Sequence, residues 1–273
     1  MTPQHLDQSE LMDSALSSSH PEHIEASQAA SLHFCGRLPY ENAWDLQRAC
    51  RIRRAADGCH DLLLLMEHPP VFTAGRTTQD HHWPGGEQLT QETGIPVIRT
   101  ERGGSITYHG PGQVIGYPIF RLSNYCPGPK AYVHRLEDIL IATLAEWDIT
   151  GHRREGFPGV WVGGPSPSKI AFIGVRISQG ITTHGFALNV SMDLEPFSHI
   201  VPCGIADCRV TSMAALLGIA PDTQAVQERI AAAFAERFQL TWTSTPVLEG
   251  IDPLLSPSTI PLMTGLINPP FSP

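Results

Sequence analysis

The stretch KIAFIGVRISQGITTHGFALNV, residues 169–190, decides the fold class. It contains two runs, 170–177 and 181–190, that alternate or are rich in β-branched residues. Ser178, Gln179 and Gly180 separate them. A short connection that contains glycine, placed between two such runs, is typical of a β-hairpin. The stretch therefore predicts two antiparallel strands.

Segments outside this hairpin predict both helices and further strands. Apolar side chains recur at steps of three and four in 130–147, from Val133 to Trp147, and this spacing is typical of an amphipathic helix. The predicted helices are 40–56, 130–147 and 223–238, and the further predicted strands are 62–66, 114–120 and 159–162. Helices mixed with hairpin-linked strands indicate an α/β (α+β) domain rather than a regular parallel βαβ array.

The 273 residues divide into three parts. Residues 1–31 contain five acidic residues and neither lysine nor arginine, and they show no apolar period, so we expect a disordered acidic extension. Residues 249–273 are rich in proline, which predicts an extended tail. The catalytic domain is therefore expected at 32–248.

Charge and hydropathy exclude several classes of function. The formal net charge is −9, and the acidic extension supplies five of these charges, so the remainder is nearly neutral and has no basic stripe for nucleic acid. Apolar runs are too short to span a membrane, and the N-terminus lacks a targeting signal, which predicts a cytoplasmic protein. Six cysteines without a Cys-x-x-Cys pair are expected to be reduced thiols.

Lys169 is conspicuous because the chain has sixteen arginines and only two lysines, Lys130 and Lys169. Lys169 directly precedes an apolar strand, whose edge would partly bury the amine. A desolvated amine is a useful proton acceptor near neutral pH. The alternative is a lysine at a strand end that extends its ammonium group to water.

Cys203 lies between Pro202 and Gly204, a setting that leaves space beside the sulfur. An ordinary thiol is mostly protonated at neutral pH, so a nucleophilic cysteine needs a cation or base nearby, and Lys169 is a candidate. The alternative is a small buried apolar residue, because most buried thiols are inert.

Residues 102–113, RGGSITYHGPGQ, contain four glycines and a proline between two apolar strands. Such a segment lets the backbone approach a ligand closely. It is neither a phosphate-binding P-loop nor a Gly-x-Gly-x-x-Gly dinucleotide site, and a tight strand connection is the alternative. His109, His184 and a cysteine lack the spacing of a zinc site, so no metal is expected.

Five blocks of sequence resemble one enzyme family in order and spacing, and they cover most of residues 35–240. The blocks are MEHPPVFTAGR (66–76), RGGSITYHGPGQVIGYPI (102–119), KIAFIGVRI (169–177), THGFALNV (183–190) and PFSHIVPCGI (196–205). They are similar to the octanoyl-(acyl-carrier-protein):protein N-octanoyltransferases of lipoate biosynthesis. The resemblance implies the fold of biotin and lipoate protein ligases, a mixed sheet with flanking helices, and no cofactor.

The resemblance also implies the residues of the site. Cys203 would be the nucleophile, and Lys169 would favour its thiolate and act as general acid and base. Contacts with the acyl group are expected from Arg102, Gly103, Gly104, Ser105, Ile106, Thr107, Tyr108, His109, Phe172, Ile173, Gly174, Gly185, Phe186 and Ala187. Among these, Phe172, Ile173 and Phe186 are the expected apolar wall.

The implied reaction moves an octanoyl group from octanoyl-acyl carrier protein to a lysine of a lipoyl domain through a Cys203 thioester. The expected acceptors are the lipoyl domains of 2-oxoacid dehydrogenases and the glycine cleavage H proteins. Since acyl carrier proteins are acidic, we expect a local basic patch. Its candidate residues are Arg102, Arg153, Arg154 and Arg176.

Two other functions remain open from the sequence. An ATP-dependent lipoate or biotin ligase on the same scaffold would use a lysine against an acyl-adenylate, and Cys203 disfavours it because such enzymes need no cysteine nucleophile. A non-catalytic binder of acyl carrier protein or lipoyl domains would require a broken or walled-off dyad. Both candidate residues, however, are present.

Overall fold

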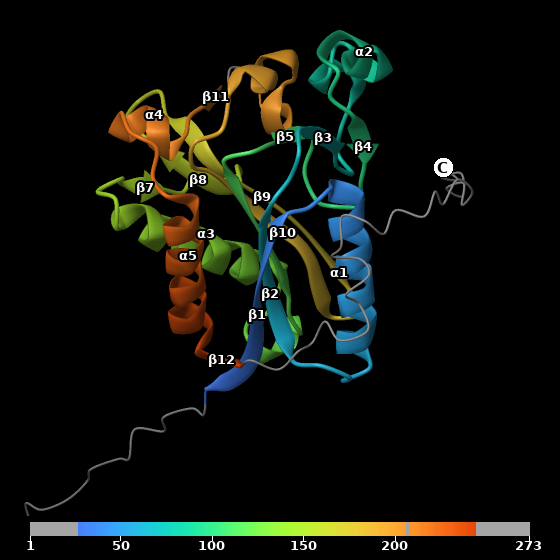
Figure 1. Cartoon of the computed structure of the whole chain (residues 1–273), viewed down its shortest axis with the longest axis vertical. Helices are drawn as coiled ribbons and strands as arrows, with labels where there is room; N and C mark the ends of the chain where they lie inside the picture. The colour runs from blue at the N-terminus through green and yellow to red at the C-terminus, as the bar shows by residue number, and fades with distance from the viewer. Residues whose placement is uncertain (1–26, 206–207, 244–273) are drawn as a thin grey trace, which may run out of the picture.

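The computed structural model describes residues 27–205 and 208–243 (Figure 1). Most of the predicted acidic extension and the whole of the predicted tail lie outside the described residues. Strand β1 (Gln28–Arg37) nevertheless begins inside the segment that the sequence assigned to the extension. Ala30 and Ser31 are fully buried there. Strand pairing on both sides orders this stretch, and its short polar sequence carries no sign of that pairing.

Within the described ranges the main sheet has nine strands, eight in the order β12-β1-β2-β6-β10-β9-β8-β7 and β11, which pairs with β9. Its strands after β1 are β2 (Asp61–Glu67), β6 (Gln113–Ile119), β7 (Gly151–His152), β8 (Gly159–Val162), β9 (Ser168–Ser178), β10 (Ile181–Asn189), β11 (Arg209–Val210) and β12 (Leu240–Thr243). β1 runs parallel to β2 and β12, whereas β2, β6, β10, β9 and β8 pair antiparallel in turn. The sheet is therefore mixed, which confirms the predicted fold class.

The hairpin predicted from residues 169–190 is formed by β9 and β10. Ile181 pairs with Ser178, so the turn consists of Gln179 and Gly180. Both residues have positive φ, 52° and 75°, as the twist of a two-residue hairpin turn requires. The ends of the two strands differ from the predicted ends by at most two residues, which is the usual uncertainty at element ends.

Helices cover both faces of the main sheet (Figure 1). On one face, α1 (Tyr40–Ala55) packs against β10 and β6. On the other, α3 (Pro129–Ala145) and α5 (Thr223–Phe238) pack on each other and on the sheet. The sheet thus separates two apolar cores, and all three predicted helices are confirmed. α4 (Met213–Leu217) is a short helix whose N-cap Ser212 accepts a hydrogen bond from the Ala215 amide.

A second, three-stranded sheet in the order β4-β3-β5 lies beside the main one, and the sequence did not predict it. Its members are β3 (Val71–Ala74), β4 (Val97–Arg99) and β5 (Thr107–His109), with α2 (Leu89–Thr93) between β3 and β4 along the chain. These strands have only three or four residues each, too few to show an alternating pattern. They bring the glycine-rich segment close to the hairpin.

Across the described ranges, every helix is too short or too polar to cross a lipid bilayer.

Candidate active site

Lys169 and Cys203 are in direct contact. The Lys169 Nζ donates a hydrogen bond to Cys203 Sγ at 3.3 Å. Lys169 is almost completely buried, and its ammonium group lies 5.2 Å from the ring centre of Trp161 and 5.1 Å from that of Phe172. Aromatic faces attract a cation, so these rings offset part of the loss of water around the amine. The sulfur therefore has a fixed, dry cation beside it.

A bulge in the sheet lies next to Lys169. On β8, Val160 pairs with Ala171 and Trp161 pairs with Lys169, so Ile170 is an extra residue on β9. A bulge breaks the strict alternation of side chains and redirects the neighbouring one. On its other side, Lys169 pairs with Val210 of β11. The backbone of Lys169 is thus paired with a strand on each side.

Cys203 occupies a one-turn 3-10 helix, η5 (Pro202–Gly204), with left-handed backbone angles of φ 57° and ψ 15°. Such a conformation is uncommon outside glycine and costs about 1–3 kcal/mol, so the surrounding structure must hold it. The Cys203 amide donates to the Ile106 carbonyl at 3.1 Å, which ties the turn to the glycine-rich segment. The thiol is partly exposed.

His82, in the 3-10 helix η1 (Asp80–His82), holds the other side of this turn. Its carbonyl accepts a hydrogen bond from the Val201 amide at 2.7 Å, and its Nδ1 lies 2.6 Å from Ser105 Oγ. Burial lowers the pKa of His82, which favours the neutral ring that accepts from the Ser105 hydroxyl. Gly204 lies against this ring, and a Cβ there would come within 2.6 Å of it.

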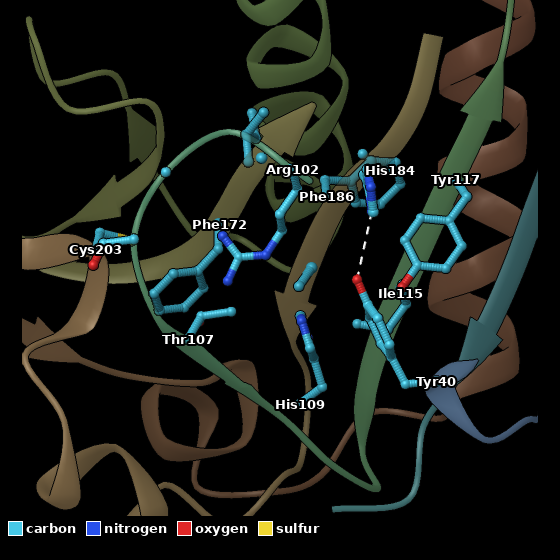
Figure 2. A pocket seen from close by; sticks show the side chains of 16 residues that line it. Tyr40, Arg102, Thr107, His109, Ile115, Tyr117, Phe172, His184, Phe186 and Cys203 are labelled. Carbon is cyan, nitrogen blue, oxygen red and sulfur yellow. Dashed lines mark hydrogen bonds between the residues drawn. The ribbon is translucent and has the colours of Figure 1, made fainter. Parts of the chain in front are cut away.

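A narrow cavity of about 40 Å³ opens beside Cys203 and runs toward α1 (Figure 2). Figure 2 shows Cys203 at one end and Tyr117 at the other, with Arg102 and His109 between them. Most residues predicted to contact the acyl group line it. They are Arg102, Gly104, Ser105, Thr107, His109, Phe172, Ile173, Gly174, Gly185, Phe186 and Ala187.

The remaining predicted residues lie elsewhere. Gly103 and Lys169 line an adjoining cavity that also contains Cys203. The Ile106 side chain is fully buried, and the Tyr108 ring packs edge-on against Phe197 at 5.7 Å. Their place in the glycine-rich segment made them candidates, but side chains alternate along residues 106–109, so Ile106 and Tyr108 point into the core, away from Thr107 and His109.

Four residues that line the cavity were not predicted to contact the acyl group: Tyr40, Ile115, Tyr117 and His184. Ile115 and Tyr117 have a detectable signal, because they alternate along the predicted strand 114–120 and so share a face. Tyr40 had none, since it begins a helix far away in the chain. The Phe186 ring, predicted as an acyl wall, also stacks on Phe234 of α5 at 5.8 Å, in the opposite core.

Arg102 is a buried cation at the centre of the cavity wall. It donates hydrogen bonds to the Thr73 carbonyl, to Thr73 Oγ1 and to the Gly103 carbonyl, and it forms no ion pair with any carboxylate in the described part of the chain. From Thr73 Oγ1 the hydrogen bonds continue to His109 Nε2 at 3.2 Å, and from His109 Nδ1 to Gln113 Oε1 at 2.8 Å. Arg102 and His109 are thus locked in orientation.

The histidines of this region are uncharged. Burial, with the charge of Arg102 as a second cause, lowers the pKa of His184 to about 3. Burial also lowers the pKa of His68 to about 4, and it holds the pKa of His109 well below its ordinary value. Among the described residues that line the cavity, Arg102 is therefore the one cationic side chain, and burial lowers its own pKa as well.

The four arginines expected to form a basic patch do not gather into one. Arg102 is inside the cavity, and Arg176 pairs with Glu101 at 2.9 Å. Arg153 binds two acidic side chains of α3. Arg154 is exposed, with its guanidinium 4.5 Å from the ring centre of Phe157. The predicted patch is absent because Arg102 is buried and because acidic side chains neutralise Arg153 and Arg176. Composition alone reveals neither the burial nor these ion pairs.

His109 and His184 both reach the cavity, but both ring nitrogens of His109 are used in hydrogen bonds. Over the described ranges, His, Cys, Asp and Glu side chains form no group of three or more suited to a metal ion.

Comparison with known proteins places this fold and site in one family. The model of the lipoyl protein ligase A/B catalytic domain matches residues 39–235. An octanoyltransferase of Chloroflexus aurantiacus is 43% identical over 211 residues, which are 77% of this chain and 94% of the relative. An octanoyltransferase of Mycobacterium leprae is 46% identical over 218 residues, which are 77% of this chain and 90% of the relative.

Solved structures agree with the fold. A bipartite lipoate protein ligase from Thermoplasma acidophilum superposes with a TM-score of 0.60 at 13% identity, over 84% of this chain and 90% of that one. The chain therefore belongs to the lipoyl protein ligase A/B catalytic-domain family. Within it, the chain belongs with the octanoyltransferases, and it is an acyltransferase.

Proposed function

We propose that this enzyme transfers an octanoyl group from octanoyl-acyl carrier protein to a lysine of a lipoyl domain, with Cys203 as the carrier of the acyl group. The observation that supports the proposal most strongly is the 3.3 Å contact between Lys169 Nζ and Cys203 Sγ at the mouth of the cavity. A thiolate, rather than a thiol, is the nucleophile, and an adjacent ammonium group stabilises it.

In the first step the Cys203 thiolate attacks the carbonyl carbon of the donor thioester. The bond to the carrier sulfur breaks, Lys169 gives a proton to the departing thiolate, and the octanoyl group remains on Cys203. One thioester replaces another, so this step is nearly balanced in free energy.

In the second step the amine of an acceptor lysine attacks the octanoyl-enzyme. An amide forms, the bond to Cys203 breaks, and the now neutral Lys169 takes the proton that the amine loses, which regenerates the starting dyad. Amide formation is the downhill step and gives the reaction its direction. The acceptors we propose are the lipoyl domains of 2-oxoacid dehydrogenases and the glycine cleavage H proteins.

The octanoyl chain would occupy the cavity beside Cys203. Phe172 and Ile173 supply apolar surface there, and burial of about seven carbon units at roughly 0.8 kcal/mol each gives about 5–6 kcal/mol of gross anchoring. Since the cavity is narrow, we expect side chains on its wall to move aside when the chain enters. The amides of Cys203, Gly204 and Ile205 all donate to carbonyl groups of the protein, so the oxyanion would take its donors from elsewhere.

Steady-state kinetics without ATP test the proposal. With octanoyl-acyl carrier protein and a lipoyl domain as substrates, we expect transfer without ATP and parallel lines in double-reciprocal plots, the signature of a covalent intermediate. A requirement for ATP would favour the ligase, and intersecting lines would point to direct transfer; either result contradicts the proposal.

A further inference from the structure

A groove that adjoins the acyl cavity leads away from the dyad. The acyl cavity and a second cavity of about 340 Å³ meet at Cys203, Gly104, Ile173 and Gly174. The second cavity also contains Lys169 and extends to Val133, Gly156, Phe157 and Pro158. These last four residues are at the same time the wall of a larger groove of about 790 Å³ along the start of α3. A path of concave surface therefore runs from the sulfur to the outside of the molecule.

Among the described residues, the outer end of this groove carries three exposed cations, Lys130, Arg153 and Arg154. Within the described ranges neither Lys130 nor Arg154 has a carboxylate within ion-pair distance, whereas their neighbour Arg153 is paired with acids of α3. The Arg154 guanidinium is held over the rings of Phe157 and Trp161, at 4.5 and 5.2 Å. One exposed acid, Glu155, lies in the same groove.

The chemistry of the donor fits this arrangement. An acyl carrier presents its thioester at the end of a long phosphopantetheine arm, so that the reacting carbon can reach Cys203 while the phosphate and the acidic protein stay outside. The acceptor presents only a lysine side chain, which does not need an extended groove. The apolar wall of Val133, Phe157 and Pro158 suits the arm, and the cations suit the acidic carrier. The protein as a whole has a formal charge of −9 and would repel an acidic partner. Exposed cations at the groove would reduce this repulsion where the partner docks.

We propose that this groove binds the phosphopantetheine arm of the acyl donor and that Lys130 and Arg154 contact the acidic surface of the carrier protein. The proposal rests on the proposed function, because it assumes a carrier-bound donor. It assigns to residues 129–133 and 153–158 the role of the donor entrance, distinct from the acyl cavity.

The test compares two donors with the double variant Lys130→Glu, Arg154→Glu. One donor is octanoyl-acyl carrier protein, and the other is octanoyl-N-acetylcysteamine, a small thioester without phosphate or protein. We expect kcat/KM for the carrier donor, relative to that for the small thioester, to fall about tenfold, chiefly through KM and more strongly at low salt. Glu155→Gln is expected to shift the ratio in the opposite direction.

Arg48→Glu is the matched control. Arg48 is likewise an exposed arginine stacked on an aromatic ring, 4.2 Å from the centre of Trp44, but it lies on α1 across the sheet. We expect it to leave the ratio unchanged. An unchanged ratio in the double variant would overturn the proposal, and so would a raised KM for the lipoyl domain in place of the carrier. Failure of the wild-type protein to form an acyl-enzyme with either donor would contradict the proposed function instead.

Discussion

At the scale of single residues, the site depends on a contact between side chains that are 34 positions apart in the chain. Lys169 comes from the start of β9 and Cys203 from a partly exposed turn. The lysine is buried between Trp161 and Phe172, so its ammonium group cannot swing away into water. A fixed cation favours the thiolate without the entropy loss that a flexible surface lysine would incur.

Replacing Lys169 by methionine therefore lowers the reactivity of Cys203. We expect the rate of alkylation of Cys203 by iodoacetamide at pH 7 to fall about tenfold in Lys169→Met, because the sulfur loses its cationic partner. Peptide mass spectrometry measures the rate at Cys203 separately from the other cysteines. Lys130→Met, an exposed lysine on α3, serves as the control and should react like the wild type. Equal rates in Lys169→Met and the wild type would refute the role of Lys169.

The sequence predicted both members of this pair but could not predict their contact. Cys203 is recognisable from Pro202 and Gly204, and Lys169 from the near absence of lysine elsewhere. The distance between the two side chains depends on the bulge at Ile170 and on the left-handed turn at Cys203. No local sequence pattern predicts the bulge or the turn. The residue types alone made Lys169 one candidate partner of Cys203, and the family resemblance then paired the two.

At the scale of elements, the turn that carries Cys203 is held from two sides, by Ile106 and by His82. Gly204 has φ +67° and no room for a side chain, since a Cβ would meet the His82 ring at 2.6 Å. Gly163 has a similar positive φ of +90° but open space around it. A substitution at Gly163 therefore introduces backbone strain alone, whereas the same substitution at Gly204 introduces backbone strain and steric overlap.

Alanine at these two positions should have different effects. Both substitutions force alanine into a left-handed conformation at a cost of about 1 kcal/mol. Gly204→Ala should lose about 1–3 kcal/mol more from overlap with His82, and it should slow acyl-enzyme formation because Cys203 shifts. Urea unfolding and single-turnover assays measure the two effects.

A second substitution checks the cause. His82→Ala combined with Gly204→Ala should recover part of the lost stability, because it removes the atoms that collide. Additive losses in the double variant would contradict the assigned contact.

Helices and strands long enough to show a repeating pattern of apolar residues were predictable from the sequence, whereas strands of three or four residues were not. The β9–β10 hairpin and the three long helices were expected from their sequences and are present. The strands β3, β4 and β5 were not expected, because pairing across the chain stabilises them rather than their own composition. They set the position of Arg102 and Thr73, so the polar part of the cavity was the least predictable.

Close packing between β6 and β10 gives another test. Phe186 lies opposite Gly116, where a Cβ would come within 2.0 Å of the ring. Gly116→Ala should therefore lower the free energy of unfolding by about 1–3 kcal/mol through overpacking. Gly164→Ala, at a position with open space, should change it by less than about 0.5 kcal/mol. Similar values for both variants in urea titrations would show that the ring has room to move.

At the scale of the whole molecule, buried neutral histidines make stability depend on pH. The pKa of His68 is lowered to about 4 and that of His184 to about 3, both chiefly by burial, whereas an unfolded histidine titrates near 6.5. Below pH 6.5 the unfolded chain binds protons that the folded protein does not. The free energy of unfolding is therefore highest above pH 6.5 and falls as the pH decreases toward the folded pKa values.

We expect each of these two histidines to reduce the free energy of unfolding by about 2 kcal/mol between pH 7 and pH 5. His68→Gln should remove the contribution of His68, so that the free energy of unfolding changes less between pH 7 and pH 5. This holds whatever the substitution does to stability at pH 7. His60→Gln, at an exposed position, is the control. Urea titrations at both pH values measure this, and the same slope in His68→Gln and the wild type would contradict the assignment of a buried neutral His68.

The covalent octanoyl-enzyme is the centre of the account, and its mass tests it most directly. Mixed with octanoyl-acyl carrier protein in the absence of an acceptor, the protein should gain the mass of one octanoyl group. Hydroxylamine should remove this group, fragmentation should locate it on Cys203, and Cys203→Ser should not acquire it. Transfer to a lipoyl domain without any such adduct, or an adduct at another residue, would contradict the account.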